Sequence, residues 1–429
     1  MKRMFHLLIA WLAYWFYGRP ARKLIVVGVT GTKGKSTACR LIASVMEAGG
    51  HKVGLLTTVE FQIADKRWAN DKKMTMLGRG QIQKMLAEMV KAGCRYAVVE
   101  TSSEGILQFR HYGLNYDIAV FMNLGEEHSE RHGGFANLKR DKGKMFAGLN
   151  RARRKIIGGK SVPKVIVANV DDENAKYYMS FAADEKYEFG MRDANITKSD
   201  ESGVEFAAQN VKYKINLVGE FNVYNALAAI AVGKSQGISE AQIAAGLASV
   251  KLVPGRMEFI NEGQDFKVVV DYAHEPMSLT ELFKTLRRLI GPQNKIIAVV
   301  GSDGGGRDKG KRAKMGEIAG RLTDRVVITD VNCFDEDPKS IAEMLAAGAR
   351  AAGKTESIDL FIELDRAKAM EKAMSLAGAG DAVVITAKGT EQWIAVAKGK
   401  KIPWDDREVA RKILNQIPSP SKCISVISE

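Results

Sequence analysis

The feature that most constrains the fold of this sequence is a glycine-rich loop close to its N-terminus. The apolar run Leu24–Val29 predicts a buried parallel strand, and a helical pattern follows the segment TGTKGKST at residues 30–37. Strand, glycine loop and helix in this order favour an anion site, because loop N–H groups and the helix N-terminus point at the ligand. A glycine turn that binds nothing is the alternative, and the position between strand and helix argues against it. The sequence therefore predicts a phosphate site made of Gly31, Thr32, Lys33, Gly34, Lys35, Ser36 and Thr37.

Four residues near this loop have side chains suited to phosphate and metal chemistry. Lys35 can reach terminal phosphates, and the Ser36 hydroxyl can bind magnesium. Glu100 ends a strand pattern, where a carboxylate can hold magnesium, although a solvated strand-end acid is the alternative. His128 follows another strand of the same predicted sheet. A lone histidine is more often structural than a ligand, but this position favours the metal.

The pattern after the loop predicts an α/β domain with a mostly parallel sheet. Strand patterns at Lys52–Thr58, Arg95–Glu100 and Asp117–Met122 alternate with a helical pattern at Gln81–Lys91. This alternation places helices on both faces of the sheet and ligands at the carboxyl ends of the strands. The alternating residues Lys186–Leu217 predict a smaller antiparallel excursion.

A second α/β domain, Rossmann-like in pattern, follows a hinge at Lys251–Gly255. Its strand patterns are Phe266–Val270, Ile296–Gly301, Asp324–Asp330 and Asp381–Ala387. The predicted division is an apolar segment at 1–22, a central domain with the phosphate loop at 23–253 and a C-terminal domain at 254–429.

Composition is that of a globular protein and limits the possible partners. The 429 residues are 46% hydrophobic and 27% charged, with a net charge of +14. No zinc-finger spacing or aromatic–basic RNA motif accompanies this charge, so we expect no nucleic-acid partner. Anionic small substrates or an anionic membrane surface explain the charge as well. The four cysteines are scattered without a CxxC pair, which indicates a reducing cytoplasm and no structural zinc site.

The segment Phe5–Tyr17 is apolar and aromatic, and basic residues flank it. It is too short to span a bilayer as a helix, and no cleavage site of a signal peptide follows it. Two interpretations stay open. The segment is a helix packed on the body of the protein, or it lies in a membrane interface, where its aromatic rings and flanking cations fit.

Beyond the loop, a series of ordered motifs runs through the chain: GTKGKST at 31–37, ETSSE at 100–104, NLGEEH at 123–128, GEFNVYNALAA at 219–229, PGRME at 254–258, DYAHEP at 271–276, GGGRDKGKR at 304–312 and KGTE at 388–391. Together they resemble the Mur ligase family, and within it most closely the UDP-N-acetylmuramoyl-tripeptide synthetases. The resemblance covers about Lys23 to Leu414.

The resemblance implies a catalytic centre with two magnesium ions. The expected metal ligands are Ser36, Glu100, His128 and Lys142, the last carbamylated by carbon dioxide to become anionic. Lys35 joins Glu100, His128 and Lys142 in the implied catalytic set. Lys139 and Lys144 compete for the carbamylated position, and a plain basic helix face is the alternative.

The resemblance also implies further nucleotide and substrate contacts. The additional ATP-binding residues are Asn222, Asn225, Arg256, Asp271 and His274. The implied substrate-binding residues are Thr75, Ser102, Arg307, Asn332 and Glu391, where Arg307 holds the carboxylate and Glu391 the ammonium of an incoming amino acid. The position that reads the distal carboxylate of diaminopimelate is occupied by Phe334, which argues against that amino acid because an apolar ring leaves the charge unpaired. A Lys or Arg elsewhere in the chain could substitute for it.

The implied function is an ATP-dependent, ADP-forming ligase that adds an amino acid to a UDP-N-acetylmuramoyl-peptide carboxylate through an acyl phosphate. It would belong to peptidoglycan precursor synthesis, and so to cell-wall biogenesis, cell shape and division, in the cytoplasm or at the inner face of the membrane. The tripeptide synthetases begin with a separate UDP-binding domain, whereas only residues 1–22 precede the loop strand in this sequence. Either the nucleotide is held differently or the acceptor differs. An amide ligase similar to folylpolyglutamate synthase and a non-catalytic nucleotide-binding protein acting through partners or membrane therefore remain as alternatives.

Overall fold

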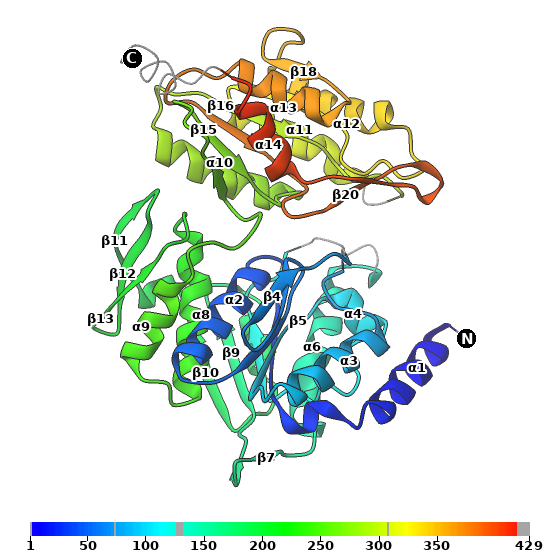
Figure 1. Ribbon diagram of the computed structural model, residues 1–429, viewed down its shortest axis with the longest axis vertical. Helices are drawn as coiled ribbons and strands as arrows, with labels where there is room; N and C mark the ends of the chain where they lie inside the picture. The colour runs from blue at the N-terminus through cyan, green and yellow to red at the C-terminus, as the bar shows by residue number, and fades with distance from the viewer. Residues whose placement is uncertain (1, 73, 126–131, 307–308, 418–429) are drawn as a thin grey trace, which may run out of the picture. The chain divides into compact units, whose positions relative to one another are not determined.

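The computed structural model describes residues 2–72, 74–125, 132–306 and 309–417. The chain divides into two compact units, Met1–Lys251 and Leu252–Glu429, each with its own sheet and core. The α/β class and the mostly parallel sheets expected from the sequence are confirmed (Figure 1).

The first unit is built on an eight-stranded sheet of order β10-β9-β6-β1-β5-β2-β3-β4. Its strands are β1 (Ile25–Thr30), β2 (Val53–Leu56), β3 (Glu60–Ile63), β4 (Lys66–Ala69), β5 (Tyr96–Glu100), β6 (Ile118–Phe121), β9 (Val165–Asn169) and β10 (Glu185–Phe189). All neighbours pair in parallel except β2 with β3 and β3 with β4. The central strands β1, β5 and β6 are fully buried, which explains their unbroken apolar sequences.

Helices cover both faces of this sheet. They are α1 (Lys2–Phe16), α2 (Lys35–Ala48), α3 (Arg79–Lys91), α4 (Ser103–Leu107), α6 (Phe135–Arg151), α7 (Ala175–Met179), α8 (Phe221–Ser235) and α9 (Glu240–Ser249), with short 3₁₀ turns η1 (Pro20–Lys23) and η2 (Met191–Asp193). Helix α2 packs against α8 and α9, whereas α3, α6 and α7 share a core with the alternate residues Val26, Ala97 and Ala119 of the sheet. A small hairpin joins β7 (Ile156–Ile157) to β8 (Lys160–Ser161).

The predicted antiparallel excursion at Lys186–Leu217 is correct only in its later part. Strands β11 (Asn195–Asp200), β12 (Gly203–Ala208) and β13 (Val211–Ile215) form a separate antiparallel sheet. Strand β10 instead pairs in parallel with β9 at the edge of the main sheet. An edge strand that is half solvated alternates apolar and polar residues whichever way its neighbour runs, so the pattern could not give its direction.

The second unit has a six-stranded sheet of order β14-β15-β19-β16-β17-β18, parallel except for β14. Its strands are β14 (Glu258–Ile260), β15 (Lys267–Val270), β16 (Ile296–Val300), β17 (Arg325–Ile328), β18 (Leu360–Ile362) and β19 (Ala382–Ile385), and β20 (Trp393–Ala395) pairs with β21 (Lys401–Pro403). Its helices are α10 (Pro276–Ile290), α11 (Gly310–Leu322), α12 (Pro338–Ala351), α13 (Arg366–Ser375) and α14 (Asp406–Leu414), with the 3₁₀ turn η3 (Ala397–Gly399). Helices α13 and α14 share one core with the sheet.

Candidate active site

The glycine loop joins the carboxyl end of β1 to the start of α2, as the sequence predicts. Asn123, which follows β6, accepts hydrogen bonds through Oδ1 from the backbone N–H groups of Thr32 (3.1 Å) and Lys33 (2.8 Å). The Lys35 ammonium folds back over the loop and donates to the Thr32 carbonyl at 2.9 Å. The loop is therefore held in shape by its own side chains and by a neighbouring strand end. Asn123 is a supporting residue that the sequence alone did not single out.

Glu100 lies at the end of β5, the strand next to β1, and only 2% of it is exposed. Its Oε2 accepts hydrogen bonds from the Ser36 hydroxyl and from the Thr58 backbone N–H, each at 2.8 Å. The Thr58 hydroxyl in turn donates to the Thr75 hydroxyl at 3.0 Å. A carboxylate and a hydroxyl side by side at a phosphate loop are oxygen donors of the kind magnesium prefers, so these residues fit the ion.

Lys142 is the lysine of α6 that reaches the loop. Its side chain is buried, and Nζ donates to the Gly31 carbonyl at 3.0 Å. The two competing lysines have other neighbours: Lys144 forms an ion pair with Asp141, and the Lys139 ammonium lies 5.2 Å from the ring centre of Tyr177. Geometry therefore separates three candidates that sequence spacing left open.

A buried polar chain lies beside Lys142. The His132 imidazole bridges Asp141 Oδ2 at 2.7 Å and the Ser103 hydroxyl at 3.1 Å. Burial opposes the charge on Asp141, but hydrogen bonds from His132 and Lys144 outweigh it and lower the pKa of that carboxyl. Because Ser103 starts α4 next to Glu100 and Asp141 precedes Lys142, this chain ties two site-bearing segments together. The sequence alone did not reveal it, since nothing local pairs residues that far apart.

Two asparagines of α8 lie against the loop. Asn225 donates to Asn222 Oδ1 at 2.9 Å, and Asn222 donates to the Val218 carbonyl at 2.8 Å. A Cβ atom placed on Gly34 would lie 2.4 Å from Asn225 Oδ1, so the amide touches the loop at its last glycine. Ser102 caps α4 by accepting a hydrogen bond from Gly105 at 3.1 Å. His128 lies outside the described residues.

The second unit carries the other predicted nucleotide contacts. The buried Asp271 carboxylate accepts from the Met257 and Ala273 N–H groups, each at 2.7 Å. Burial raises the pKa of Asp271, and the nearby Arg256 opposes that rise. Arg256 stacks over Tyr272 at 4.7 Å, and the His274 Nδ1–H donates to the Tyr272 carbonyl at 2.7 Å. The three predicted residues therefore cluster where β15 ends.

Asn332 and Glu391 meet in a buried network of the second unit. Asn332 Nδ2 donates to Glu391 Oε2 at 3.1 Å and to Asp303 Oδ1 at 2.7 Å. The buried Lys388 ammonium donates to Glu391 Oε2 at 3.0 Å. The sequence predicted Asn332 and Glu391 but missed Asp303 and Lys388, which lie shortly after the ends of β16 and β19. Arg307 lies outside the described residues.

Phe334 belongs to the loop after β17, and its ring packs against the glycine-rich segment beside this network. Its backbone is left-handed, with φ of 53°, and a Cβ atom on Gly305 would lie 3.0 Å from its ring. Next to it, Arg312 is fully buried and donates to both carboxylate oxygens of Glu336, at 2.7 and 2.9 Å. The hydrogen bond from Arg312 lowers the pKa of Glu336 to about 2. Arg312 is therefore already paired with Glu336, and the apolar ring of Phe334 offers no charge of its own.

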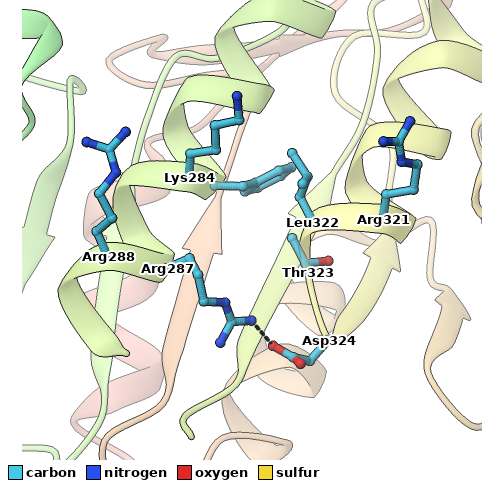
Figure 2. Close-up of a pocket in the computed structure, with 8 residues that line it drawn as sticks. Lys284, Arg287, Arg288, Arg321, Leu322, Thr323 and Asp324 are labelled. Carbon is cyan, nitrogen blue, oxygen red and sulfur yellow. Dashed lines mark hydrogen bonds and ion pairs between the residues drawn. The ribbon is translucent and has the colours of Figure 1, made fainter. Parts of the chain in front are cut away.

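A cavity of about 480 Å³ lies at the end of the second sheet where its parallel strands begin. It is separate from the networks described above. Figure 2 shows Arg287 pointing at Asp324, whereas the charged ends of Lys284, Arg288 and Arg321 point away from this pair. Asp324 comes just before β17 and also accepts from the Ile296 N–H at 2.7 Å. The cations lie towards the carboxyl ends of α10 and α11, where they complement the helix dipoles. This cavity lies away from the strand ends that carry the predicted site.

Two structural features bear on metal and membrane. Within residues 2–72, 74–125, 132–306 and 309–417, no group of three or more His, Cys, Asp and Glu side chains is placed to hold a metal ion. In the same residues, no helix is long and apolar enough to cross a bilayer.

Comparison with known proteins agrees with the motifs. The sequence pattern of the Mur ligase middle domain matches residues 29–233, and that of the Mur ligase glutamate ligase domain matches residues 255–389. The chain is 37% identical over 422 residues to a UDP-N-acetylmuramyl-tripeptide synthetase of Roseiflexus, covering 95% of this chain and 82% of that relative. It is 36% identical over 423 residues to a UDP-N-acetylmuramoyl-L-alanyl-D-glutamate–2,6-diaminopimelate ligase of Geobacillus kaustophilus, with the same coverage.

Solved structures give the same result. A ligase with the latter name matches with a TM-score of 0.59 at 28% identity, covering 92% of this chain and 78% of that one. A folylpolyglutamate synthase of Mycobacterium tuberculosis has a TM-score of 0.68 at 18% identity, covering 89% of this chain and 92% of that one, a likeness of fold alone. The chain therefore belongs to the Mur ligase family and is, like its members, an ATP-dependent enzyme that forms amide bonds.

Proposed function

We propose that this ligase adds an amino acid to the terminal carboxylate of a UDP-N-acetylmuramoyl peptide, a step of peptidoglycan precursor synthesis. The observation that carries the proposal is the convergence of Lys35, Ser36, Glu100 and Lys142 on one loop. The names of the relatives that match almost the whole chain support the same reaction.

The proposed chemistry begins with attack of the acceptor carboxylate on the γ-phosphate of ATP, giving an acyl phosphate and ADP. The loop N–H groups and Lys35 hold the phosphates, and Asn222 and Asn225 contact the nucleotide from α8. Ser36, Glu100, His128 and a carbamylated Lys142 would hold two magnesium ions, which would neutralise charge on the transferring phosphoryl group. We also assign Arg256, Asp271 and His274 of the second unit to binding of the nucleotide.

The amine of the incoming amino acid then attacks the acyl phosphate, forms the amide bond and releases phosphate. We assign its ammonium to Glu391, oriented by Asn332, and its carboxylate to Arg307. Thr75 and Ser102 are the proposed contacts to the acceptor. Because Phe334 offers no charge and Arg312 is already paired with Glu336, a distal carboxylate on the amino acid would be unpaired there. The substrate we propose lacks that group.

The location that fits these substrates is the cytoplasm, at the inner face of the membrane. ATP is the energy source of the reaction, and the buried or scattered cysteines suit a reducing compartment. The contact with the membrane would be peripheral.

The test is phosphate release from ATP by the full chain with UDP-N-acetylmuramoyl dipeptide and a panel of amino acids. We expect release that requires both the acceptor and one amino acid, with diaminopimelate a poor donor. Lys35→Met should abolish release, and the exposed Lys314→Met serves as the matched control. Turnover only with a folate acceptor and glutamate would transfer the assignment to a folylpolyglutamate-type ligase, and no turnover with any pair would favour a binding role.

A further inference from the structure

Helix α1 is fixed to the first unit by one of its faces. Ala10, Ala13 and Tyr14 are buried, and α1 packs against α3. The Tyr14 ring meets Tyr112 edge-on at 6.0 Å, and its hydroxyl accepts from the Arg22 guanidinium at 3.2 Å. These contacts confirm the packed-helix interpretation of the N-terminal segment. They also set which side of the helix points outward.

The outward side is apolar and aromatic as well. Its members recur every three or four residues along the helix and are exposed: Phe5, Leu8, Trp11, Leu12, Trp15 and Phe16. Half of Trp15 and 82% of Phe16 are in contact with solvent. Single exposed apolar residues are ordinary, but a continuous stripe of this size on one helix marks an interaction surface.

Cations follow this stripe along the chain. The first acidic residue of the chain is Glu47, so residues 1–46 contain none, whereas Arg19, Arg22 and Lys23 directly follow the helix. The Arg19 guanidinium lies over the Trp15 ring at 4.5 Å. Within residues 1–46, every charged side chain is therefore a cation.

A second segment adds to the same positive surface. The Lys155 ammonium donates to the Leu24 carbonyl at 2.9 Å, which brings the β7–β8 hairpin beside η1. That hairpin and its approach expose Arg153, Lys160 and the apolar Ile156, of which 75% is in solvent. Figure 1 shows α1 and β7 both standing out from the rest of the first unit. Cations and an exposed apolar side chain thus occur together at the end of the sheet where its parallel strands begin, next to η1, which follows α1 along the chain.

We propose that this surface, α1 with the β7–β8 hairpin, docks the enzyme on an anionic lipid bilayer. Trp, Phe and Leu side chains fit the boundary between headgroups and acyl chains, and flanking Lys and Arg meet anionic headgroups. A helix of 15 residues is too short to cross the hydrocarbon core, so it lies in the plane of the interface. A protein partner would use the apolar stripe but would leave the surrounding cations unexplained.

The orientation leaves the catalytic loop open. η1 and the hairpin lie where β1 begins, and the phosphate loop lies where β1 ends, about 20 Å away for a six-residue strand. Docking therefore goes beyond the ligase reaction and does not depend on it. Its use would be to keep the enzyme beside a membrane, while nucleotide and peptide enter from the aqueous side.

The experiment is co-sedimentation of the full chain with vesicles of phosphatidylcholine, with and without phosphatidylglycerol. We expect binding to the anionic vesicles, little binding to neutral ones, and weakening by salt. Tryptophan emission should shift to the blue on binding. Leu8→Gln with Leu12→Gln should weaken binding about tenfold or more, because each replacement removes a buried apolar contact with lipid. Ile358→Gln with Ile402→Gln, exposed in the second unit, is the matched control.

A charge variant separates the two components. Lys23→Gln with Arg153→Gln should weaken binding to anionic vesicles and reduce its salt dependence, with phosphate release unchanged. Equal binding of the Leu8/Leu12 variant and the parent protein would overturn the proposal, as would equal binding to neutral and anionic vesicles. The proposal would also be overturned if the parent protein formed a dimer without lipid and the Leu8/Leu12 variant were monomeric, because the stripe would then be an interface between two copies. Absence of binding to any vesicle would overturn it without touching the ligase assignment.

Discussion

Gly34→Ala is the substitution for which the structure gives the clearest magnitude. Gly34 has φ of 77°, a conformation that costs a residue with a side chain roughly 1 kcal/mol. Its new Cβ would lie 2.4 Å from Asn225 Oδ1, so the amide must move. Moving it breaks the 2.9 Å hydrogen bond to Asn222 inside the protein, which costs about 1–3 kcal/mol. We expect a total loss of about 2–4 kcal/mol in the free energy of unfolding.

The same helix provides the control. Gly50, just after the carboxyl end of α2, has φ of 84°, and among the described residues no neighbouring atom lies within 4 Å of the position that an added Cβ would take. Gly50→Ala should therefore lose only the backbone part, about 1 kcal/mol.

The assay is urea unfolding of the nucleotide-free chain, with titration of a fluorescent ATP analogue to follow the loop. In an Asn225→Ala background, Gly34→Ala should lose about 1–3 kcal/mol less than in the parent, because the clash is gone. Equal losses for Gly34→Ala and Gly50→Ala would refute the contact between loop and amide. A double-mutant cycle without coupling would refute it as well.

Three further outcomes follow from other parts of the first unit. Glu100→Gln keeps an oxygen that can accept from Ser36 but removes the charge, so phosphate release should fall about 100-fold or more while the unfolding midpoint hardly changes. His132→Gln should lower the free energy of unfolding by about 1–3 kcal/mol, because Asp141 and Ser103 lose a buried partner, and the exposed Arg140→Gln should not. Burial, with a smaller contribution from Lys144, lowers the pKa of His111 from 6.5 to about 4. As the pH falls from 6.5 to 4, His111 therefore binds a proton in the unfolded chain but not in the folded chain. The free energy of unfolding should drop by up to about 3 kcal/mol over this range, and this pH dependence should be absent from His111→Gln.

Sequence reasoning placed the residues that lie on strand ends and loops. Lys35, Ser36 and Glu100 were predicted correctly to lie together, because parallel strands bring their carboxyl ends to one edge. The Asp271 cluster and the Asn332–Glu391 pair of the second unit came instead from the resemblance to the Mur ligase family. The local sequence pattern is sufficient to predict a functional residue when that residue lies where a strand ends and a loop or helix begins.

The residues that were missed are joined by contacts distant in sequence. His132 and Ser103 are 29 positions apart, Asp303 and Asn332 are 29 apart, and Lys388 and Asn332 are 56 apart. Asp303 has no motif of its own, and the KGTE motif that contains Lys388 does not identify the partners of that lysine. The predicted direction of β10 was wrong for a related reason, since the sequence pattern of an edge strand is the same whether its neighbour is parallel or antiparallel. Long-range pairing had to come from the tertiary structure.

The position of Lys142 links its proposed carbamylation to metal binding. In the structure its ammonium is buried and donates to the Gly31 carbonyl, an interaction that needs a proton on Nζ. A carbamate at the same place would set a negative charge near that carbonyl oxygen, where water is scarce and repulsion is strong. A cation is then required to stabilise it, so removal of magnesium should release carbon dioxide from Lys142. Carbon-13 NMR of protein in labelled bicarbonate should give a carbamate signal that needs magnesium and is absent from Lys142→Met but present in Lys139→Met. A signal that persists in a chelator would contradict the coupling.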